Sequence, residues 1–205
     1  RGKPGTGGAW RVTLGRMSAS AEPRAMIVRS KAGNQELKIE NVLVGEVWFC
    51  SGQSNMGLAL RDCFRAPEEI AAANYPQFRV FVVPGGGAPV PTADLAGGKW
   101  QVCTPDTAAY FAGTAYFFGR ALHRELQVPV GLIEFDRGAT GIEGWVPLAA
   151  YKASSAPALQ AMYREAASWD PRTEIGRQAH DDAFAKIEAW LPAAKAALRD
   201  GKPVP

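Results

Sequence analysis

The fold is decided by the stretch Val42-Leu-Val-Gly-Glu-Val-Trp-Phe-Cys50, which runs directly into the polar turn Ser51-Gly-Gln-Ser-Asn55. The first stretch is almost entirely apolar and rich in β-branched and aromatic residues, which is typical of a strand buried on both faces of a sheet. Similar strands are predicted at Phe78–Val83 and Pro129–Ile133, and an apolar stripe predicts a helix over Thr107–Leu126. Strands that alternate with helices in this way predict an α/β fold with a parallel sheet covered by helices.

The first forty residues differ from the rest, because they predict strands without helices. Short alternating or apolar runs occur at Trp10–Leu14, Ala25–Val28 and Leu37–Glu40, with Gly- and Asn-rich turns between them. Three short strands alone cannot bury two faces of a sheet. We therefore expect residues 1–40 to be the C-terminal part of a small β-sandwich-like domain, and residues 41–205 to form the α/β domain.

Two further helices are predicted from proline placement and apolar spacing. A short helix is expected at Pro67–Ala73, where proline suits the first turn and the following carboxylates favour the amino end. A long, Ala-rich amphipathic helix is expected at Glu174–Arg199. Pro192 should kink or break this helix, and Gly201 suits its end.

Composition excludes several classes of protein. The 205 residues are 47% hydrophobic and 21% charged, which rules out a disordered chain, a collagen-like repeat and a coiled coil. No apolar run of about 18 residues predicts a membrane span, and the dispersed net charge of +3 does not predict binding to nucleic acid or to a membrane. Cys50, Cys63 and Cys103 lack the spacing of a zinc site, and one disulfide with a free thiol or three free thiols both stay open.

Two polar turns follow predicted strands, Gly52-Gln-Ser-Asn55 and Gly138-Ala-Thr-Gly141. Ligands of open α/β sheets bind beyond the carboxyl ends of the strands. A serine on a sharp strand-to-helix turn exposes its hydroxyl there, and backbone N–H groups close by can stabilise an oxyanion. Ser54 is therefore a candidate nucleophile, although Met56 stands where the Gly-x-Ser-x-Gly elbow of α/β-hydrolases has its second glycine. The same residues also fit an ordinary turn without chemistry.

The long block at residues 42–56 closely resembles the first motif of the sialate O-acetylesterase family, which belongs to the SGNH (GDSL-like) hydrolases. Further similar segments lie at residues 71–81, 116–123, 128–133 and 138–145. The resemblance implies a three-layer SGNH-hydrolase fold, flavodoxin-like, in which helices flank a parallel sheet. The strands of residues 1–40 resemble the end of the small β-domain that precedes the catalytic domain in this family.

The resemblance also implies a role for each site residue. Ser54 would be the nucleophile, and its own N–H and that of Gly138 would form the oxyanion hole. The residues expected to hold the turn by hydrogen bonds, to anchor the loop after Gly138 or to line the pocket mouth are Gln53, Asn55, Glu143 and Trp145. Three positions depart from the family pattern: Arg137 replaces Trp, Ala139 replaces the second Gly, and Gly141 replaces Pro.

Two later motifs of the family do not occur in these 205 residues: Tyr-Gln-Gly-Glu, and the Asp-x-x-His pair that carries the general base. Serine is a poor nucleophile without a base. His123 and His180 are interpreted as structural or surface residues. We therefore expect the chain to be the N-terminal and middle portion of a longer enzyme, with the catalytic His supplied from a segment outside it, for example a second fragment of the same polypeptide.

The function expected from the resemblance is a serine carboxylester hydrolase that removes O-acetyl groups from sialic acid or a related sugar through an acetyl-serine intermediate. No metal or organic cofactor is implied, and the family resemblance implies a secreted or periplasmic location. The alternatives are a non-catalytic carbohydrate-binding protein that keeps the fold without the base, and acetyl transfer to an acceptor other than water. Glu134 and Asp136, at the end of the third strand, could reach the pocket, but a solvated loop is the favoured expectation.

Overall fold

The computed structural model describes residues 10–30, 35–85 and 92–205. The chain divides into two compact units. The first contains residues up to 85 together with 95–138, and the second contains 86–94 and 139–205. The predicted boundary between residues 40 and 41 does not separate these units, because both sides of it lie in the first unit; as a domain boundary it stays a prediction.

The first unit begins with an antiparallel hairpin of β1 (Ser20–Arg29) and β2 (Glu36–Val44). These strands contain two of the three predicted N-terminal strands. The prediction of a strand at Trp10–Leu14 is wrong, because this segment is exposed and pairs with no strand among the described residues. An alternation of apolar and polar residues does not by itself make a strand where no neighbouring strand supplies hydrogen bonds.

Gly45 separates the hairpin from the sheet, so the predicted continuous strand at residues 42–50 is in fact broken. The backbone of Gly45 lies against Pro129, and a methyl group on Gly45 would come within 2.7 Å of the Pro129 carbonyl carbon. The Glu46 N–H donates to Pro129 O at 2.9 Å. The hairpin is also held to the sheet by Arg79, whose guanidinium donates to the backbone oxygen and Oδ1 of Asn41 at 2.7 and 2.8 Å.

The second sheet has four strands in the order β3-β6-β4-β5. The strands are β3 (Glu46–Gly52), β4 (Tyr75–Val82), β5 (Trp100–Cys103) and β6 (Val130–Asp136). β6 is parallel to both β3 and β4, whereas β5 is antiparallel to β4. The sheet is therefore mixed and mostly parallel. The strand order differs from the predicted flavodoxin-like order. In a flavodoxin-like sheet the first parallel strand of the chain lies between the second and the third. Here the third parallel strand, β6, lies between the first, β3, and the second, β4.

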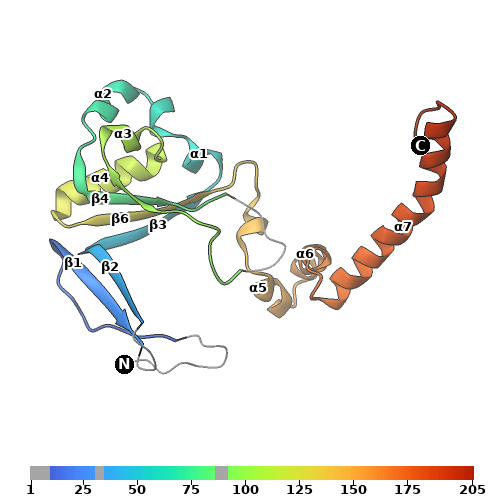
Figure 1. The fold of residues 1–205 in the computed structure, drawn as a ribbon, viewed down its shortest axis with the longest axis horizontal. Coiled ribbons are helices and arrows are strands. Elements are labelled where there is room, and N and C mark those ends of the chain that lie inside the picture. The colour runs from blue at the N-terminus through green and yellow to red at the C-terminus, as the bar shows by residue number, and fades with distance from the viewer. Residues whose placement is uncertain (1–9, 31–34, 86–91) are drawn as a thin grey trace. The chain divides into compact units, whose positions relative to one another are not determined.

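Helices of the first unit cover one face of this sheet (Figure 1). They are α1 (Ser54–Gly57), the 3-10 helix η2 (Leu60–Asp62), α2 (Ala66–Ala71), α3 (Pro105–Ala108) and α4 (Gly113–Leu126). The predicted helix at 107–126 thus begins six residues too early. Residues 109–112 leave the helical path because Ala112 forms an antiparallel bridge with Ala59. The predicted helix at 67–73 agrees with α2 to within two residues at each end.

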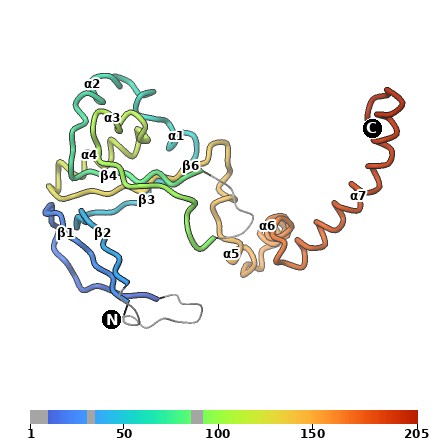
Figure 2. The backbone as a smooth tube through the Cα atoms, in the orientation of Figure 1, coloured from blue at the N-terminus to red at the C-terminus, as the bar shows by residue number. Residues whose placement is uncertain are grey.

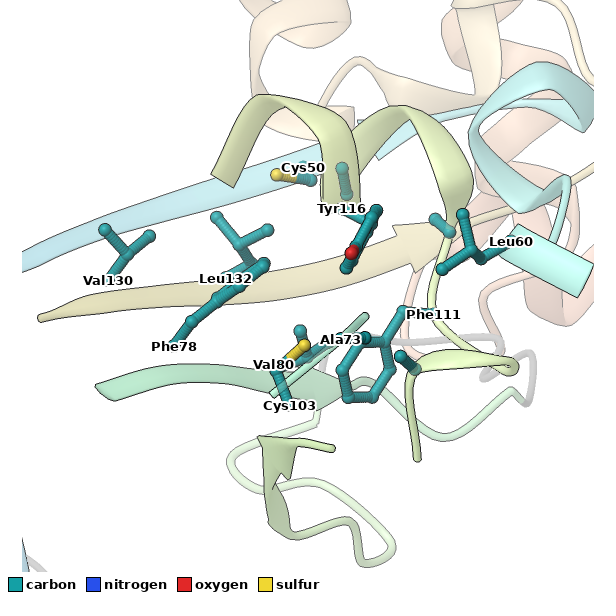
Figure 3. Close-up of a cluster of buried hydrophobic side chains, with 13 residues drawn as sticks. Cys50, Leu60, Ala73, Phe78, Val80, Cys103, Phe111, Tyr116, Val130 and Leu132 are labelled. Carbon is teal, nitrogen blue, oxygen red and sulfur yellow. The ribbon is translucent and has the colours of Figure 1, made fainter. Parts of the chain in front are cut away.

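The core lies between α4 and the inward face of the sheet (Figure 3). Phe78, Leu132 and Tyr116 are fully buried, and the rings of Phe78 and Tyr116 stack with centroids 6.1 Å apart. α4 approaches the sheet closely at Gly119, where a methyl group would lie 2.7 Å from Phe78 Cζ and 2.8 Å from Leu132 Cδ1.

The prediction that the first strand is buried on both faces is wrong. Cys50 faces the core, and Trp48 packs edge-on against Phe118 of α4 with ring centroids 5.3 Å apart. Val47 and Phe49 point to the opposite face and are 63% and 62% exposed. Strand composition identifies apolar residues, but it cannot show that a second layer covers them.

The second unit is helical. It contains η3 (Ile142–Trp145), α5 (Leu148–Ala153), α6 (Pro157–Ser168) and α7 (Glu174–Arg199). α7 has the predicted bounds, and the Thr173 hydroxyl caps it by accepting from Gly176 N–H at 2.8 Å. Pro192 lies inside the helix without ending it, and the backbone trace in Figure 2 follows α7 as one helix.

Candidate active site

The carboxyl end of β3 runs into a tight turn that begins α1. The Gln53 carbonyl accepts hydrogen bonds from the N–H groups of Met56 and Gly57 at 2.8 and 3.2 Å. Ser54 is the first residue of α1, and its side chain is exposed rather than packed into the core. The turn therefore presents the Ser54 hydroxyl at the edge of the sheet where the parallel strands end.

Gly138 lies next to Ser54 because β3 and β6 are neighbouring parallel strands. Gly52 pairs with Asp136 at the end of both strands, and the Arg137 N–H donates to Gly52 O at 3.0 Å. A methyl group on Gly138 would lie 3.3 Å from Ser54 Oγ, which is a tight contact. The N–H groups of Ser54 and Gly138 donate to no other described residue. Both amides are thus free to bind an oxygen atom of a ligand.

The acidic residue beside the turn is Asp136, the last residue of β6. Its carboxylate occupies the space in front of Gly57, where a methyl group would lie 2.8 Å from Asp136 Cγ. The side chain is exposed and accepts no hydrogen bond from a described residue. An alanine at position 57 would therefore displace the Asp136 carboxylate from its place beside α1.

Glu134 lies deeper in the same strand, and its expected placement in a solvated loop is wrong. The residue is 5% exposed and belongs to β6. Its Oε2 accepts from the Ala112 N–H at 3.1 Å, whereas Oε1 is buried and has no hydrogen-bond partner among the described residues. The alternation Val130, Leu132, Glu134 along the strand could have revealed this burial, because every second side chain of a strand faces the same side.

Burial is the main reason that the pKa of Glu134 is raised to about 7. The hydrogen bond from Ala112 lowers the pKa, and the negative charge of Asp136 raises it further. The pKa of the Cys50 thiol, beside Glu134 on β3, is also raised, mainly by burial and then by the charge of Glu134. The interior of the protein beneath the turn at Ser54 therefore disfavours negative charge.

Gln53 and Asn55 hold the turn through their backbone carbonyls. The Asn55 carbonyl accepts from the Thr114 hydroxyl at 3.2 Å, which ties α1 to the first turn of α4. Both side chains are exposed and form no hydrogen bond with the described residues. The hydrogen bonds of these two residues in the turn thus come from their backbone carbonyls, and a role in binding substrate stays a prediction.

The loop after Gly138 belongs to the second unit. Ala139 adopts a left-handed backbone conformation with φ of 58°, which a glycine would adopt with less strain. Trp145 Nε1 donates to the Thr140 hydroxyl at 3.1 Å, and the Glu143 carbonyl accepts from the Tyr151 hydroxyl at 2.7 Å. Glu143 and Trp145 thus make contacts that can anchor this loop, while a place at the pocket mouth stays a prediction.

Each of the two histidines has a backbone carbonyl as its hydrogen-bond partner. His123 Nδ1 lies 2.8 Å from Val128 O, and its ring packs edge-on against Tyr75, the first residue of β4. His123 is therefore at the amino ends of the parallel strands, opposite the edge that carries Ser54. His180 Nδ1 lies 2.6 Å from Gly176 O within α7, in the second unit. Neither histidine forms a hydrogen bond with Ser54.

Three further observations concern thiols, metals and membranes. All three cysteines are free thiols, and Cys50 and Cys103 are buried. Within residues 10–30, 35–85 and 92–205, no cluster of three or more His, Cys, Asp or Glu side chains could hold a metal ion. No helix in this described part of the chain has the length and apolar character needed to cross a membrane.

The fold and the exposed serine define an α/β protein similar to a carbohydrate acetylesterase. The crystal structure of a carbohydrate acetylesterase from Xanthomonas citri matches this chain with a TM-score of 0.65 and 36% sequence identity, over 72% of this chain and 33% of that one. No family model matches the chain.

The curated relatives are sialate O-acetylesterases. The protein from Rattus norvegicus is 33% identical over 162 residues, which is 75% of this chain and 30% of the relative. The Homo sapiens protein is 34% identical over 132 residues, covering 60% of this chain and 25% of the relative. These matches confirm the resemblance to the sialate O-acetylesterase family. The chain spans about a third or less of the length of the proteins that it matches.

Proposed function

We propose that this chain carries the nucleophile and two oxyanion donors of a serine carboxylester hydrolase that removes O-acetyl groups from a carbohydrate. The observation that supports the proposal is the exposed Ser54 hydroxyl beside Gly138, at the carboxyl ends of two parallel strands. The names of the relatives, sialate O-acetylesterase and carbohydrate acetylesterase, favour an acetylated sugar such as an O-acetylated sialic acid as the substrate.

The proposed reaction has two steps. Ser54 Oγ attacks the acetyl carbonyl carbon while a base takes its proton, and the N–H groups of Ser54 and Gly138 stabilise the oxyanion. The bond to the sugar oxygen then breaks, the sugar leaves with a proton, and an acetyl-serine remains. Water attacks this ester next, which releases acetate and restores the hydroxyl.

The proposed base is a histidine outside these 205 residues, as the family resemblance implies. His123 lies at the amino ends of the parallel strands, away from Ser54. The comparisons do not support a separate second fragment as its source. A secreted or periplasmic location also stays a prediction from the family resemblance.

Chemical rescue tests the proposal without any further polypeptide. The chain is incubated with p-nitrophenyl acetate and free imidazole, which substitutes for the missing base, and acetyl transfer to Ser54 is followed by peptide mass spectrometry. We expect an imidazole-dependent acetyl group on Ser54 that is absent from Ser54→Ala. The matched control Ser51→Ala, three residues earlier on β3, should be acetylated like the parent. Acetylation that is equal at Ser51 and Ser54 would contradict the proposal.

A second candidate function is a carbohydrate-binding protein without catalysis. It is favoured by one observation: the Ser54 hydroxyl forms no hydrogen bond with a described residue and so has no base in this part of the chain. An O-acetylated sialic acid that binds the chain, but is never hydrolysed in the presence of imidazole, would support this candidate over the first.

A further inference from the structure

Glu134 is a buried ionisable group of the first unit that the proposed reaction does not use. Its flanking residues in the sheet are Cys50 on β3 and Val82 on β4, and the Ala112 amide approaches it from the amino end of α4. A leucine would fill this volume without a buried oxygen that lacks a partner, such as Oε1 of Glu134, but it would leave the Ala112 N–H without its acceptor. A buried unsatisfied oxygen costs stability, so packing alone does not account for a carboxyl group here.

The hydrogen bond from Ala112 connects Glu134 to the residues of α4 that contact the turn carrying Ser54. The next residue, Gly113, donates its N–H to Leu58 O at 2.8 Å. The following residue, Thr114, donates its hydroxyl to Asn55 O at 3.2 Å. Three consecutive residues at the amino end of α4 thus form a connected set of contacts. Ala112 binds Glu134 of β6, and the next two residues bind Leu58 and Asn55, at the two ends of the segment that follows Ser54.

We infer that Glu134 is a positioning residue for Ser54: its carboxyl group fixes the amino end of α4, and α4 in turn fixes the turn that carries the nucleophile. This inference rests on the proposed function, since it takes Ser54 as the reacting group. The titratable groups that act on Glu134 are Asp136 on its own strand and Cys50 on β3. The residues that face it from α4 and β4, Ala112 and Val82, carry no charge.

A thiol at position 54 reports on this coupling without needing the base. In the 205-residue chain carrying Ser54→Cys, the rate of alkylation of position 54 by iodoacetamide is measured from pH 5 to 10. Peptide mass spectrometry separates this thiol from Cys50, Cys63 and Cys103. Because thiolate is the reactive form, the rate follows the pKa and the surroundings of that thiol.

Two substitutions at Glu134 separate positioning from packing. The parent Ser54→Cys profile should carry a step near pH 7 from the titration of Glu134. Glu134→Gln keeps an oxygen that accepts from the Ala112 N–H but cannot titrate, so the rate should stay within about twofold while this step disappears. Glu134→Leu removes the acceptor, so the thiol pKa should move by about one unit, which is about a tenfold change in thiolate at a fixed pH below that pKa. The control Glu125→Leu, an exposed glutamate late in α4, should leave the profile unchanged.

The inference is overturned if the folded Glu134→Leu chain has the same profile as the parent Ser54→Cys chain. If Glu134→Leu does not fold, the Glu134→Gln profile decides alone, and a step near pH 7 that persists in that variant overturns the inference. The proposed function fails separately, when imidazole-dependent acetylation of Ser54 is absent in the otherwise natural chain. The thiol experiment does not depend on that result.

Discussion

The titration of Glu134 should make the stability of the fold depend on pH in an unusual direction. The pKa of Glu134 is about 7 in the folded chain, against an ordinary value of 4.5. Between these two values, the folded chain keeps a proton that the unfolded chain has lost. Unfolding therefore releases a proton, and the free energy of unfolding falls as the pH rises from about 4.5 to about 7 and then levels off.

The magnitude follows from the difference between the two pKa values. A difference of about 2.5, at 1.36 kcal/mol for each pKa unit, corresponds to a loss of about 3 kcal/mol across this pH window. This is a large part of the 5–15 kcal/mol that is typical for a domain. Hydrogen bonds from Arg172 lower the pKa of Asp170 below its ordinary value of 3.8. The titration of Asp170 therefore changes the free energy of unfolding only below about pH 4, outside this pH window.

Urea unfolding followed by circular dichroism at pH 5 and pH 8 measures the effect. The parent chain should be less stable at pH 8, and Glu134→Gln should remove most of that difference because the amide does not titrate. Glu125→Gln, on the exposed surface of α4, should behave like the parent. The reasoning is refuted if Glu134→Gln keeps the full pH dependence, since another group would then cause it.

Glycine and alanine positions give three further predictions. Ala139→Gly should raise the free energy of unfolding by roughly 0.5–1 kcal/mol in urea titrations, because glycine adopts the left-handed conformation with less strain. Gly119→Ala should lower it by roughly 1–2 kcal/mol because the methyl group clashes with the sheet, while Gly85→Ala, whose methyl group meets open space, should have little effect. Gly138→Ala should slow imidazole-dependent acetylation of the nucleophile by about tenfold or more, because the methyl group crowds its hydroxyl. The control Gly144→Ala, whose methyl group would have no atom within 4 Å, should not slow this acetylation.

The turn at Ser54 and the bounds of α7 could be predicted because local signals define them. An apolar strand followed by Gly-Gln-Ser-Asn marks the first, and a capping threonine with an amphipathic pattern marks the second. The approach of Gly138 to Ser54 also follows from the sequence, since the predicted sheet is parallel and both residues follow strands. These features depend on neighbouring residues or on one simple topological rule.

Other features depend on contacts between distant segments. Helix α4 begins at Gly113 rather than at Thr107 because Ala112 pairs with Ala59, a contact that periodicity cannot show. The order of the strands is likewise a property of the packed sheet. The alternation of Val130, Leu132 and Glu134 indicates that the Glu134 side chain faces inward, but the packing of α4 over β6, which buries it, is a contact between distant segments.

The short junction at Gly45 limits how the gene for this protein can change in length. β2 ends at Val44 and β3 begins at Glu46, so one extra residue here would shift β3 by one position against β6. Because successive strand residues point to opposite faces, that shift would turn Phe49 inward and Cys50 outward. Insertions and deletions should therefore be selected against at this junction, even though most turns tolerate them.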